Sequence, residues 1–376
     1  MRTKRGYPHV IDACALAHRL IAADTSETDG IRSAAGFVKG WLEARDIEVR
    51  DFVHNGRPVL GATVGATAGP TIILHGHVDV VPGRPEQFQP RIEGDRLIGR
   101  GAYDMKGGLA AMMIATAELA AQDRVRVHFV CVPDEESDTA ADRASDRLVE
   151  EGYTGDFAIT GEPTDLHIGV QAKGVLALRI EVEGKAAHGS TPWEGDNAVL
   201  KAIDVFRSIE SLPFTRESSD LFDRPSINLG RIMGGDVMNR VPDRCVIDVD
   251  IRFLPGQDAE ELLTAIGSVA GEKVSVVLHR DPAIVDRANP HVLKLAEAVS
   301  DHPHGDRISV GRDGASDAVS FLDAGIPAVE FGPVGGGHHG PDEWVSISSL
   351  DRYRAALVEF VHLVAEGAEG KHLRIA

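Results

Sequence analysis

Cysteine is scarce in this sequence, and its few cysteines are far apart. The 376 residues include only three, Cys14, Cys131 and Cys245, and no Cys-x-x-Cys pair occurs. So few thiols in a chain of this length do not indicate a disulfide framework, and a thiolate zinc site would need closely spaced cysteines. Nitrogen and oxygen ligands are therefore expected at any metal site.

Long apolar runs and an excess of positive charge are also missing. No stretch reaches the ~18–20 apolar residues that a membrane span requires, and Asp12 and His18 interrupt the apolar start, so we expect no signal peptide. Lys and Arg total 39 against 58 Asp and Glu, which gives a net charge of −19. Because such a chain repels nucleic acid and anionic membranes, we expect neither as a partner. The default expectation is a cytoplasmic protein that acts on a small molecule.

Helix-like and strand-like segments alternate in the first 160 residues or so and again after residue 290. Apolar spacing predicts helices over 9–23, 30–45, 108–122 and 142–152, and strands over 71–77, 125–132 and 157–160. Alternation of this kind is typical of the α/β class. We therefore predict a mostly parallel sheet that is covered by helices on both faces.

The pattern changes in the middle of the chain to strands with alternating polar and apolar residues. These strands are expected at 175–187, 226–235, 244–256 and 274–280, with helices near 196–210 and 258–270. The order strand, helix, strand, strand, helix, strand predicts a compact α+β unit. We therefore predict a catalytic domain in two parts, 1–173 and 289–376, with an inserted domain at 174–288.

Polar residues with metal-binding side chains follow the ends of the predicted α/β strands. They are His77 and Asp79 at and just after the end of the strand 71–77, Glu135 and Glu136 after 125–132, Glu162 after 157–160, and His338 and His339 after a strand at 327–332. Asp104 lies between glycines just before a predicted helix. Because ligands gather beyond the carboxyl ends of parallel strands, these side chains are expected to meet at one edge of the sheet.

Imidazole nitrogens and carboxylate oxygens are suitable ligands for two divalent ions of the zinc type. Two ions ~3.5–4 Å apart need a bridging carboxylate in a rigid place, and Asp104, held between glycines, is the best candidate. Glu135 and Glu136 are adjacent, so on an extended segment their side chains point in opposite directions. One of them can then bind metal while the other serves as a base for amide hydrolysis.

Five motifs in this order resemble a known family. "HGHVDVVP", "GRGAYDMKGG", "PDEES", "GEPT" and "HHGPDEW" are similar to the signature series of the di-zinc aminoacylase and carboxypeptidase family. That family includes acetylornithine deacetylase, succinyl-diaminopimelate desuccinylase, glutamate-releasing carboxypeptidases and dipeptidases. The resemblance covers nearly the whole chain. It implies two Zn²⁺ ions, with Co²⁺ or Mn²⁺ as possible substitutes.

The resemblance also implies a role for each residue of these motifs. One zinc ion would be held by His77 and Glu162, the other by Glu136 and His339, with Asp104 as the bridge. Glu135 would be the general base, and Asp79 would orient His77. His339 is the expected ligand because the family ligand stands two residues before a proline, here Pro341, so His338 would be only a neighbour.

The inserted domain carries the rest of the resemblance, which implies a lid and dimerisation role for it. In "GKAAHGSTPWEGDNA", His188 would reach the active site of the other subunit of a homodimer and stabilise the oxyanion. In "NRVPDRCVIDVDIRF", Asn239 and Arg252 would hold the substrate carboxylate. The loop "GASDA" at 314–318, with Ser316, would line the same pocket, although Ala315 stands where the family has threonine.

The sequence therefore favours a zinc-dependent amidohydrolase that cleaves an N-acyl amino acid, like a deacetylase or desuccinylase. A metallocarboxypeptidase or dipeptidase that acts on short peptides with a free carboxylate is the alternative, because the same chemistry serves both. Two further hypotheses are a non-catalytic relative, against which the intact Glu135 argues, and a di-metal phosphohydrolase, which predicts phosphate release and no action on amides.

Overall fold

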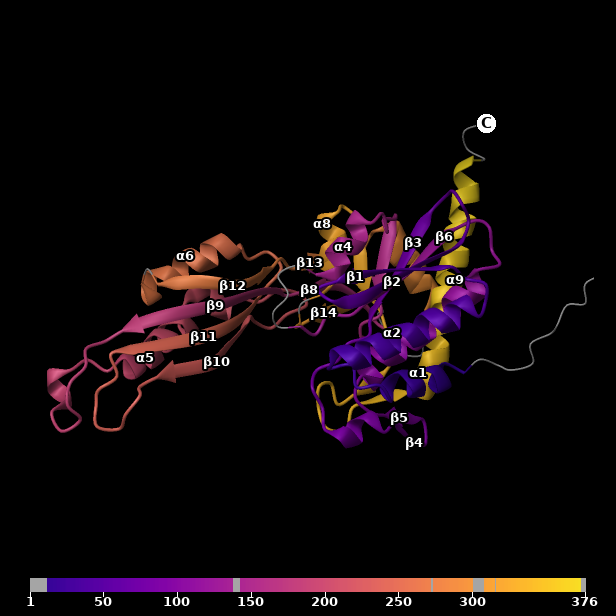
Figure 1. The fold of residues 1–376 in the computed structure, drawn as a ribbon. Helices are drawn as coiled ribbons and strands as arrows, with labels where there is room; N and C mark the ends of the chain where they lie inside the picture. Colours follow the sequence, from indigo (N-terminus) through magenta and orange to yellow (C-terminus); the bar gives the residue numbers. More distant parts are fainter. Residues whose placement is uncertain (1–11, 138–142, 272, 300–307, 315, 373–376) are drawn as a thin grey trace, which may run out of the picture. The chain divides into compact units, whose positions relative to one another are not determined.

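The computed structural model describes residues 12–137, 143–271, 273–299, 308–314 and 316–372 (Figure 1). These residues form two compact units. Unit 1 draws on residues within 1–169, 285–309 and 320–376, and unit 2 on residues within 170–284 and 310–319. Unit 2 is thus built mainly from one continuous segment that interrupts the sequence of unit 1.

The described part of the chain contains the following helices and short helical turns, of which the first two precede the first strand. The helices are α1 (Ala13–Ile21), α2 (Thr28–Glu43), α3 (Gly107–Leu119), α4 (Ala144–Glu150), α5 (Ala198–Glu210), α6 (Ala259–Ala270), α7 (Pro290–Ala298), α8 (Ala318–Asp323) and α9 (Ile347–His372). Short helical turns are η1 (Pro85–Phe88), η2 (Ala102–Lys106), η3 (Pro192–Glu194) and η4 (Pro213–Arg216).

The strands are β1 (Val49–His54), β2 (Arg57–Gly65), β3 (Thr71–His77), β4 (Arg91–Glu93), β5 (Arg96–Ile98), β6 (Arg126–Val132), β7 (Phe157–Thr160), β8 (Ile168–Ala172), β9 (Gly174–Glu183), β10 (Ser226–Gly234), β11 (Arg244–Phe253), β12 (Val274–Arg280), β13 (Ala283–Ile284), β14 (Ile308–Arg312), β15 (Ala328–Glu330), β16 (Gly335–Gly336) and β17 (Trp344–Ser346).

The main sheet of unit 1 has a parallel centre. Its strands follow the order β1-β2-β6-β3-β7-β15. β6, β3, β7 and β15 pair in parallel, whereas β1, β2 and β6 pair antiparallel. The carboxyl ends of four neighbouring parallel strands therefore lie along one edge, where the predicted ligands follow β3, β6, β7 and β15. A smaller sheet in the order β16-β17-β5-β4 completes unit 1.

Helices cover both faces of this sheet, as the contacts of two consecutive residues of β3 show. All seven residues of β3 are buried. His75 contacts Ser145 of α4 at 2.9 Å and packs edge-on against Phe321 of α8. A Cβ atom on the next residue, Gly76, would lie 3.2 Å from Leu109 of α3. Successive side chains of a strand point to opposite faces, so α3 covers one face and α4 and α8 cover the other.

Unit 2 is the α+β unit that the sequence pattern predicts. Its elements run β9, α5, β10, β11, α6, β12, and its strands pair antiparallel in the order β10-β11-β9-β12 (Figure 1). β11 alternates along its length, with Cys245, Ile247, Val249, Ile251 and Phe253 buried in one core with residues of α5 and α6. The predicted fold class, an α/β unit with an inserted α+β unit, is confirmed.

Most element boundaries differ from the predicted ones by a few residues. The first predicted helix, 9–23, is observed as Ala13–Ile21, and its residues 9–11 lie outside the described part of the chain. The observed start has a local cause, because Asp12 Oδ1 accepts a hydrogen bond from the N–H of Cys14 at 2.8 Å. The predicted helix 142–152 is observed as Ala144–Glu150, and its residue 142 is likewise not described.

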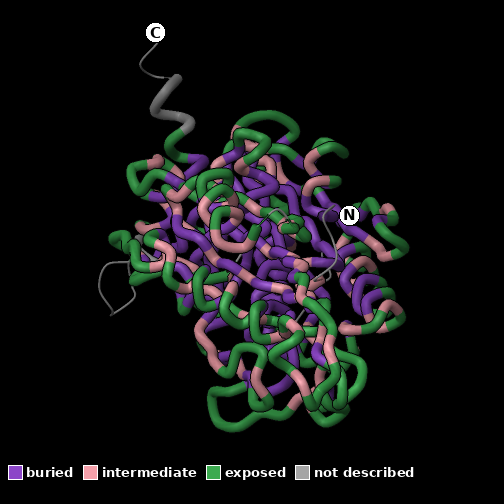
Figure 2. The backbone as a smooth tube through the Cα atoms, turned by 90° about the vertical axis from the view of Figure 1, so that its left-hand side faces the viewer, coloured by how far each residue is buried: buried purple, intermediate pink, exposed green. Residues whose placement is uncertain are grey.

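The burial of individual residues is drawn along the chain in Figure 2, where buried residues are purple. All three cysteines are buried free thiols, which agrees with the prediction that no disulfide framework exists. Burial raises the pKa of Cys14 to about 11 and that of Cys131 to about 12, so these thiols are protonated and unreactive at neutral pH. Among the described residues, none of the helices combines the length and apolar character that crossing a membrane requires.

Candidate metal centre

His77 is the last residue of β3 and is fully buried at the carboxyl edge of the sheet. Its Nδ1 lies 3.0 Å from the main-chain oxygen of Asp79 and 3.5 Å from Asp79 Oδ1. Its Nε2 lies 3.0 Å from Asp104 Oδ1 and 3.5 Å from Glu162 Oε1. Because Nδ1 is directed at the Asp79 carbonyl, Nε2 faces the two carboxylates and is the ring atom that would bind a metal ion.

Asp104 lies in η2, the turn that leads into α3, and it is buried. The turn begins at Gly101, whose φ of 79° is in the left-handed region that favours glycine. The N–H of Asp104 donates to Glu343 Oε1 at 3.0 Å. Three imidazoles reach the Asp104 side chain: His77 approaches Oδ1, while His338 and His339 approach Oδ2. Asp104 is therefore the centre of the cluster, as the bridging prediction requires.

Glu343 has no predicted role, yet it fixes the Asp104 turn. It is 1% exposed, and its carboxylate accepts hydrogen bonds from the N–H groups of Gly101, Tyr103 and Asp104, each at 3.0 Å. It also accepts one from Arg100 Nη1 at 2.8 Å. The signal that could have found Glu343 is its position in the same motif as His339, because a carboxylate beside a ligand motif can support the ligands.

The segment with Glu135 and Glu136 is held from two sides. Asp79 Oδ1 accepts from the N–H of Glu135 at 3.3 Å, and Oδ2 accepts from the N–H of Glu136 at 2.9 Å. Arg143 Nη1 donates to the carbonyl of Glu135 at 2.7 Å and also to that of Asp134. Asp79 thus links the His77 strand end to the segment with the two glutamates, in addition to its contact with His77.

His338 and His339 occupy the middle of a tight turn. The N–H of Gly340 donates to the carbonyl of Gly337 at 2.7 Å, which closes the four-residue turn. His339 has a φ of 55°, in the left-handed region that costs a non-glycine residue strain energy. Its Nε2 lies 2.9 Å from Glu136 Oε1 and 3.4 Å from Asp104 Oδ2. The strained backbone thus turns the predicted ligand toward two of its predicted partners.

The described residues contain two groups of side chains that could hold a metal ion, and they share Asp104. One group is His77, Asp104 and Glu162, and the other is Asp104, His338 and His339. Two ligand atoms ~2.0–2.1 Å from a tetrahedral zinc ion lie about 3.3 Å apart. The measured separations from His77 and His339 to their carboxylate neighbours, 2.9 to 3.5 Å, are close to this spacing.

An unpaired oxygen gives an independent indication that a cation fits here. Glu162 Oε1 is buried and has no hydrogen-bond partner among the described residues. Burying a carboxylate oxygen without a hydrogen bond is costly, and its neighbour His77 Nε2 lies 3.5 Å away, so a cation between the two would be favourable. The structure brings together five predicted ligands, His77, Asp104, Glu136, Glu162 and His339, and nitrogen and carboxylate oxygen donors suit zinc.

The protonation of the cluster reflects its concentration of carboxylates. Burial lowers the pKa of His77, but hydrogen bonds to Asp104 and Asp79 outweigh it and leave the pKa well above its usual value. Burial and the charge of Asp104 raise the pKa of Glu162 well above its usual value. Hydrogen bonds to Asp104 and Glu136 raise the pKa of His339 to about 10. A divalent cation would displace these protons and neutralise the same charge.

The four other predicted site residues belong to unit 2. His188 lies beside the segment of Asn239, because the N–H of Gly189 donates to the carbonyl of Asn239 at 2.7 Å. Both side chains are exposed. Arg252, on β11, donates to Asp250 at 3.1 Å, and the buried Ser316 accepts a hydrogen bond from the N–H of Ala318 at 3.1 Å. The approach of these residues to substrate stays a prediction.

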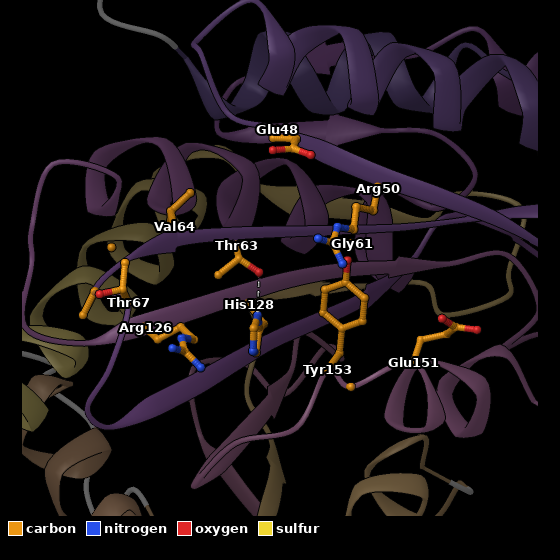
Figure 3. A pocket seen from close by; sticks show the side chains of 13 residues that line it. Glu48, Arg50, Gly61, Thr63, Val64, Thr67, Arg126, His128, Glu151 and Tyr153 are labelled. Carbon is orange, nitrogen blue, oxygen red and sulfur yellow. Dashed lines mark hydrogen bonds between the residues drawn. The ribbon is translucent and has the colours of Figure 1, made fainter.

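A cavity of about 460 Å³ lies elsewhere on unit 1, over β2 and β6 (Figure 3). None of its lining residues belongs to the metal-ligand groups. His128 lies in its wall, with Nδ1 2.8 Å from Thr63 Oγ1, and Tyr153 packs edge-on against the His128 ring. Burial and the charge of Arg126 lower the pKa of His128 to about 4, so this imidazole is neutral and packs as part of the sheet surface.

Known proteins resemble this chain over most of its length. The model of the peptidase family M20/M25/M40 matches residues 73–363. The "Probable succinyl-diaminopimelate desuccinylase" of Staphylococcus epidermidis is 26% identical over 88% of this chain and 93% of its own length. The succinyl-diaminopimelate desuccinylase of Stenotrophomonas maltophilia is 31% identical over 78% of this chain and 83% of its own length.

A solved structure resembles the fold. The crystal structure of an M20 family metallo-carboxypeptidase from Sulfolobus solfataricus superposes with a TM-score of 0.79 and 19% identity, over 94% of this chain and 99% of that chain. At this identity the likeness concerns the fold alone. It agrees with the α/β unit and the inserted α+β unit described above.

Proposed function

Because this chain belongs to the peptidase family M20/M25/M40, we propose that it is a zinc-dependent amidohydrolase that removes the acyl group of an N-acyl amino acid. The coarser prediction, a metal-dependent hydrolase of amide C–N bonds, is confirmed by the family. The observation that carries the finer proposal is the position of Asp104, which belongs to two groups of potential metal ligands at once.

The relatives favour a succinyl group as the acyl group to test first. The proteins of Staphylococcus epidermidis and Stenotrophomonas maltophilia are both named as desuccinylases. A metallocarboxypeptidase or dipeptidase that acts on short peptides with a free carboxylate is the alternative function. The two differ only in what the pocket accepts on either side of the amide, because the zinc chemistry is the same.

Two Zn²⁺ ions would be held by residues that lie at the edge of the unit 1 sheet. His77 and Glu162 would hold the inner ion and Glu136 and His339 the outer ion, with Asp104 between them; Co²⁺ or Mn²⁺ are possible substitutes. "Inner" and "outer" refer to exposure, since the side chain of His77 is 0% exposed and that of His339 is 45% exposed. When bound, the ions supply Lewis acidity, which polarises the amide carbonyl and lowers the pKa of water.

Glu135 would take the proton from the attacking water and pass it to the leaving amine. Its charge contributes to the raised pKa of Glu162, so its carboxylate is close enough to the cluster to influence a ligand. The backbone of Glu135 is held by Asp79 and Arg143, which fixes the main chain from which its carboxylate extends.

The substrate would be gripped by residues of the inserted domain, for which we propose the predicted limits 174–288, between catalytic parts 1–173 and 289–376. Asn239 and Arg252 would bind the carboxylate of the amino acid, and His188 would stabilise the oxyanion from the partner subunit. Ser316, in the second catalytic part, would line the same pocket. An arginine offers two parallel N–H donors to a carboxylate, which suits a substrate that must carry one.

A homodimer that forms through unit 2 is part of this proposal. α5 and β10 lie against each other, and both carry exposed apolar side chains: Leu200 is 60%, Ile203 39%, Ile232 41% and Met233 44% exposed. Among the described strands, β10 pairs with β11 and lies at the edge of the sheet. An apolar patch beside an open strand edge is a typical interface between copies. The cytoplasmic location expected from the sequence is also a proposal.

The test is the release of amine by the zinc-loaded protein from a panel of N-succinyl and N-acetyl amino acids, dipeptides and glutamate conjugates. Glu135→Gln is measured alongside, with Glu150→Gln of α4 as an exposed control. We expect a strong hit among N-acyl amino acids that falls at least 1,000-fold in Glu135→Gln, although two zinc ions remain bound, and that is unchanged in the control.

Other results would change the assignment. Turnover of dipeptides alone would select the peptidase alternative. Phosphate release from phosphoesters with no action on amides would select the phosphohydrolase hypothesis. If no substrate of the panel released amine although two zinc ions were bound, a binding role would be favoured. A Glu135→Gln variant as active as the wild type would refute the proposed base.

A further inference from the structure

We infer that His338 is a second imidazole ligand of the outer metal ion, beside His339. This inference rests on the proposed function, because it concerns the same site. The sequence patterns require one histidine at this position, and His338 was expected to be only a neighbour. The structure instead brings His338 Nε2 into contact with Asp104 Oδ2, the same oxygen that His339 Nε2 approaches at 3.4 Å.

The turn explains how two consecutive histidines reach one carboxylate oxygen. In an extended strand, consecutive side chains point to opposite faces. Here the hydrogen bond between Gly337 and Gly340 closes a tight turn, and His339 has a φ of 55°. The left-handed conformation at the third turn position brings the rings of His338 and His339 to the same side, with centroids 4.3 Å apart.

The ligand atoms of His338, His339 and Asp104 lie within 4.8 Å of one another. One ion that binds each ligand at ~2.0–2.1 Å can gather such a set with a small side-chain movement. The His338 ring is 44% exposed, so it is free to make that movement, and Tyr103 packs against it edge-on at 6.1 Å. Tyr103 is next to Asp104, so this contact keeps the ring near the cluster.

The second imidazole makes the two metal positions chemically different. The inner ion would have one imidazole, His77, and two carboxylates. The outer ion would have two imidazoles, His338 and His339, with the carboxylates of Asp104 and Glu136. Imidazole suits zinc, copper and nickel, whereas carboxylate-rich sites suit manganese and magnesium. His338 should therefore raise the preference of the outer position for zinc over manganese.

His338 could alternatively act only as a hydrogen-bond donor to Asp104. A glutamine side chain can donate the same hydrogen bond but is a poor metal ligand, so His338→Gln separates the two roles. His339→Gln removes the expected ligand, and His18→Gln, at an exposed position on α1, is the matched control. Three readouts are needed: stepwise Zn²⁺ and Mn²⁺ affinities from competition with a chelator, the visible bands of the Co²⁺-loaded protein, and the number of imidazole ligands from X-ray absorption.

We expect His338→Gln to weaken the binding of one of the two ions by at least tenfold, to lower its zinc-to-manganese affinity ratio, and to change the Co²⁺ bands. His339→Gln should affect the same ion, and His18→Gln should equal the wild type. A His338→Gln protein with wild-type affinities and bands would overturn the inference and leave a single-histidine outer site. A loss in His338→Gln alone would also overturn it, because His338 would then replace His339. A wild-type protein that binds no zinc would instead refute the proposed function.

Discussion

The carboxylate of Glu343 supports the backbone of Asp104, whose N–H donates to Glu343 Oε1 at 3.0 Å. The same buried carboxylate pairs with Arg100, whose side chain is 4% exposed, at 2.8 Å. The residue shared by the two candidate ligand groups is thus fixed by a residue outside both of them. Removing this support should loosen Asp104 without removing any ligand.

The first prediction concerns that support. Glu343→Gln leaves Arg100 buried without its counter-charge, and breaking a buried ion pair on one side typically costs about 3–5 kcal/mol. We expect a loss of this order in the free energy of unfolding of the metal-free protein, measured in urea, together with weaker zinc binding.

The matched control is Glu93→Gln, which removes the exposed ion pair of Glu93 with Arg91 at 2.9 Å. A surface pair contributes about 0–1 kcal/mol, so this variant should remain close to the wild type. Equal stability of the Glu343 and Glu93 variants would contradict the supporting role of Glu343.

The second prediction concerns the removal of metal. A ligand that binds only the folded state at 100 times its Kd stabilises that state by about 2.7 kcal/mol. Zinc should therefore raise the melting temperature of the wild type markedly, and a chelator should reverse the effect. In His77→Gln, zinc should raise the melting temperature less than in the wild type, because the inner site loses its only imidazole and should bind almost no zinc. A zinc response in His77→Gln equal to that of the wild type would argue against the inner site.

The third prediction concerns pH in the metal-free protein. The pKa of His339 is raised to about 10 in the folded state by its hydrogen bonds to Asp104 and Glu136, against ~6.5 for an unperturbed histidine. The stabilisation by charged His339 is therefore complete below pH ~6.5 and is lost as the pH rises to about 10. The stability of the wild type relative to His339→Gln should fall across this range, as measured by urea unfolding with chelator at several pH values.

The wild type must be compared with His339→Gln because Lys106 titrates in the same pH range and has the opposite effect on stability. Burial lowers the pKa of Lys106 to about 7, so its contribution to stability rises as the pH increases from 7 toward the unfolded value of ~10.4. This contribution is common to the wild type and to His339→Gln and cancels in their difference. A difference that is constant from pH 7 to 10 would show that His339 is not paired with carboxylates.

The fourth prediction tests the strained turn. His339→Ala and His339→Gly both remove the imidazole, but only glycine adopts a φ of 55° without strain. We expect the glycine variant to be more stable than the alanine variant by about 1 kcal/mol in urea unfolding, while both lose the outer metal ion equally. An alanine variant of equal or greater stability would contradict the left-handed conformation.

The fifth prediction tests the proposed dimer. Leu200→Glu places a charge on the apolar patch of α5 and β10 and should convert a dimer into a monomer in light scattering. Val276→Glu is the control, because Val276 is also exposed, at 47%, but lies on β12, at the other edge of the unit 2 sheet. A wild-type monomer, or equal effects of the two variants, would argue against this interface.

Much of this site is predictable from the sequence because the positions of strand ends are predictable from the pattern of apolar residues. His77, Glu136 and Glu162 follow apolar strands that pair in parallel, so their positions at one edge follow from the strand pattern. Asp104 is predictable as a bridge from its place between glycines, whereas the choice of His339 as the ligand depends on the family resemblance, because its turn has no periodic pattern.

The residues that the sequence did not reveal act through turns and main-chain groups. Arg143 binds the carbonyl of Glu135, Glu343 binds the N–H groups of the Asp104 turn, and His338 reaches Asp104 through the left-handed conformation of its neighbour. Contacts of this kind depend on where the main chain runs in three dimensions. The type of a residue and its spacing in the sequence do not specify that path.

The clamping of the segment with Glu135 and Glu136 has a consequence for the catalytic cycle. Asp79 accepts from the N–H groups of Glu135 and Glu136, and Arg143 donates to the carbonyls of Asp134 and Glu135, so the proposed base and a proposed ligand share one hydrogen-bonded stretch of main chain. A shift of this main chain toward a substrate would move the proposed base Glu135 and the proposed ligand Glu136 together. Under these proposed roles, the amide would have to be brought to the base by the way the substrate is seated.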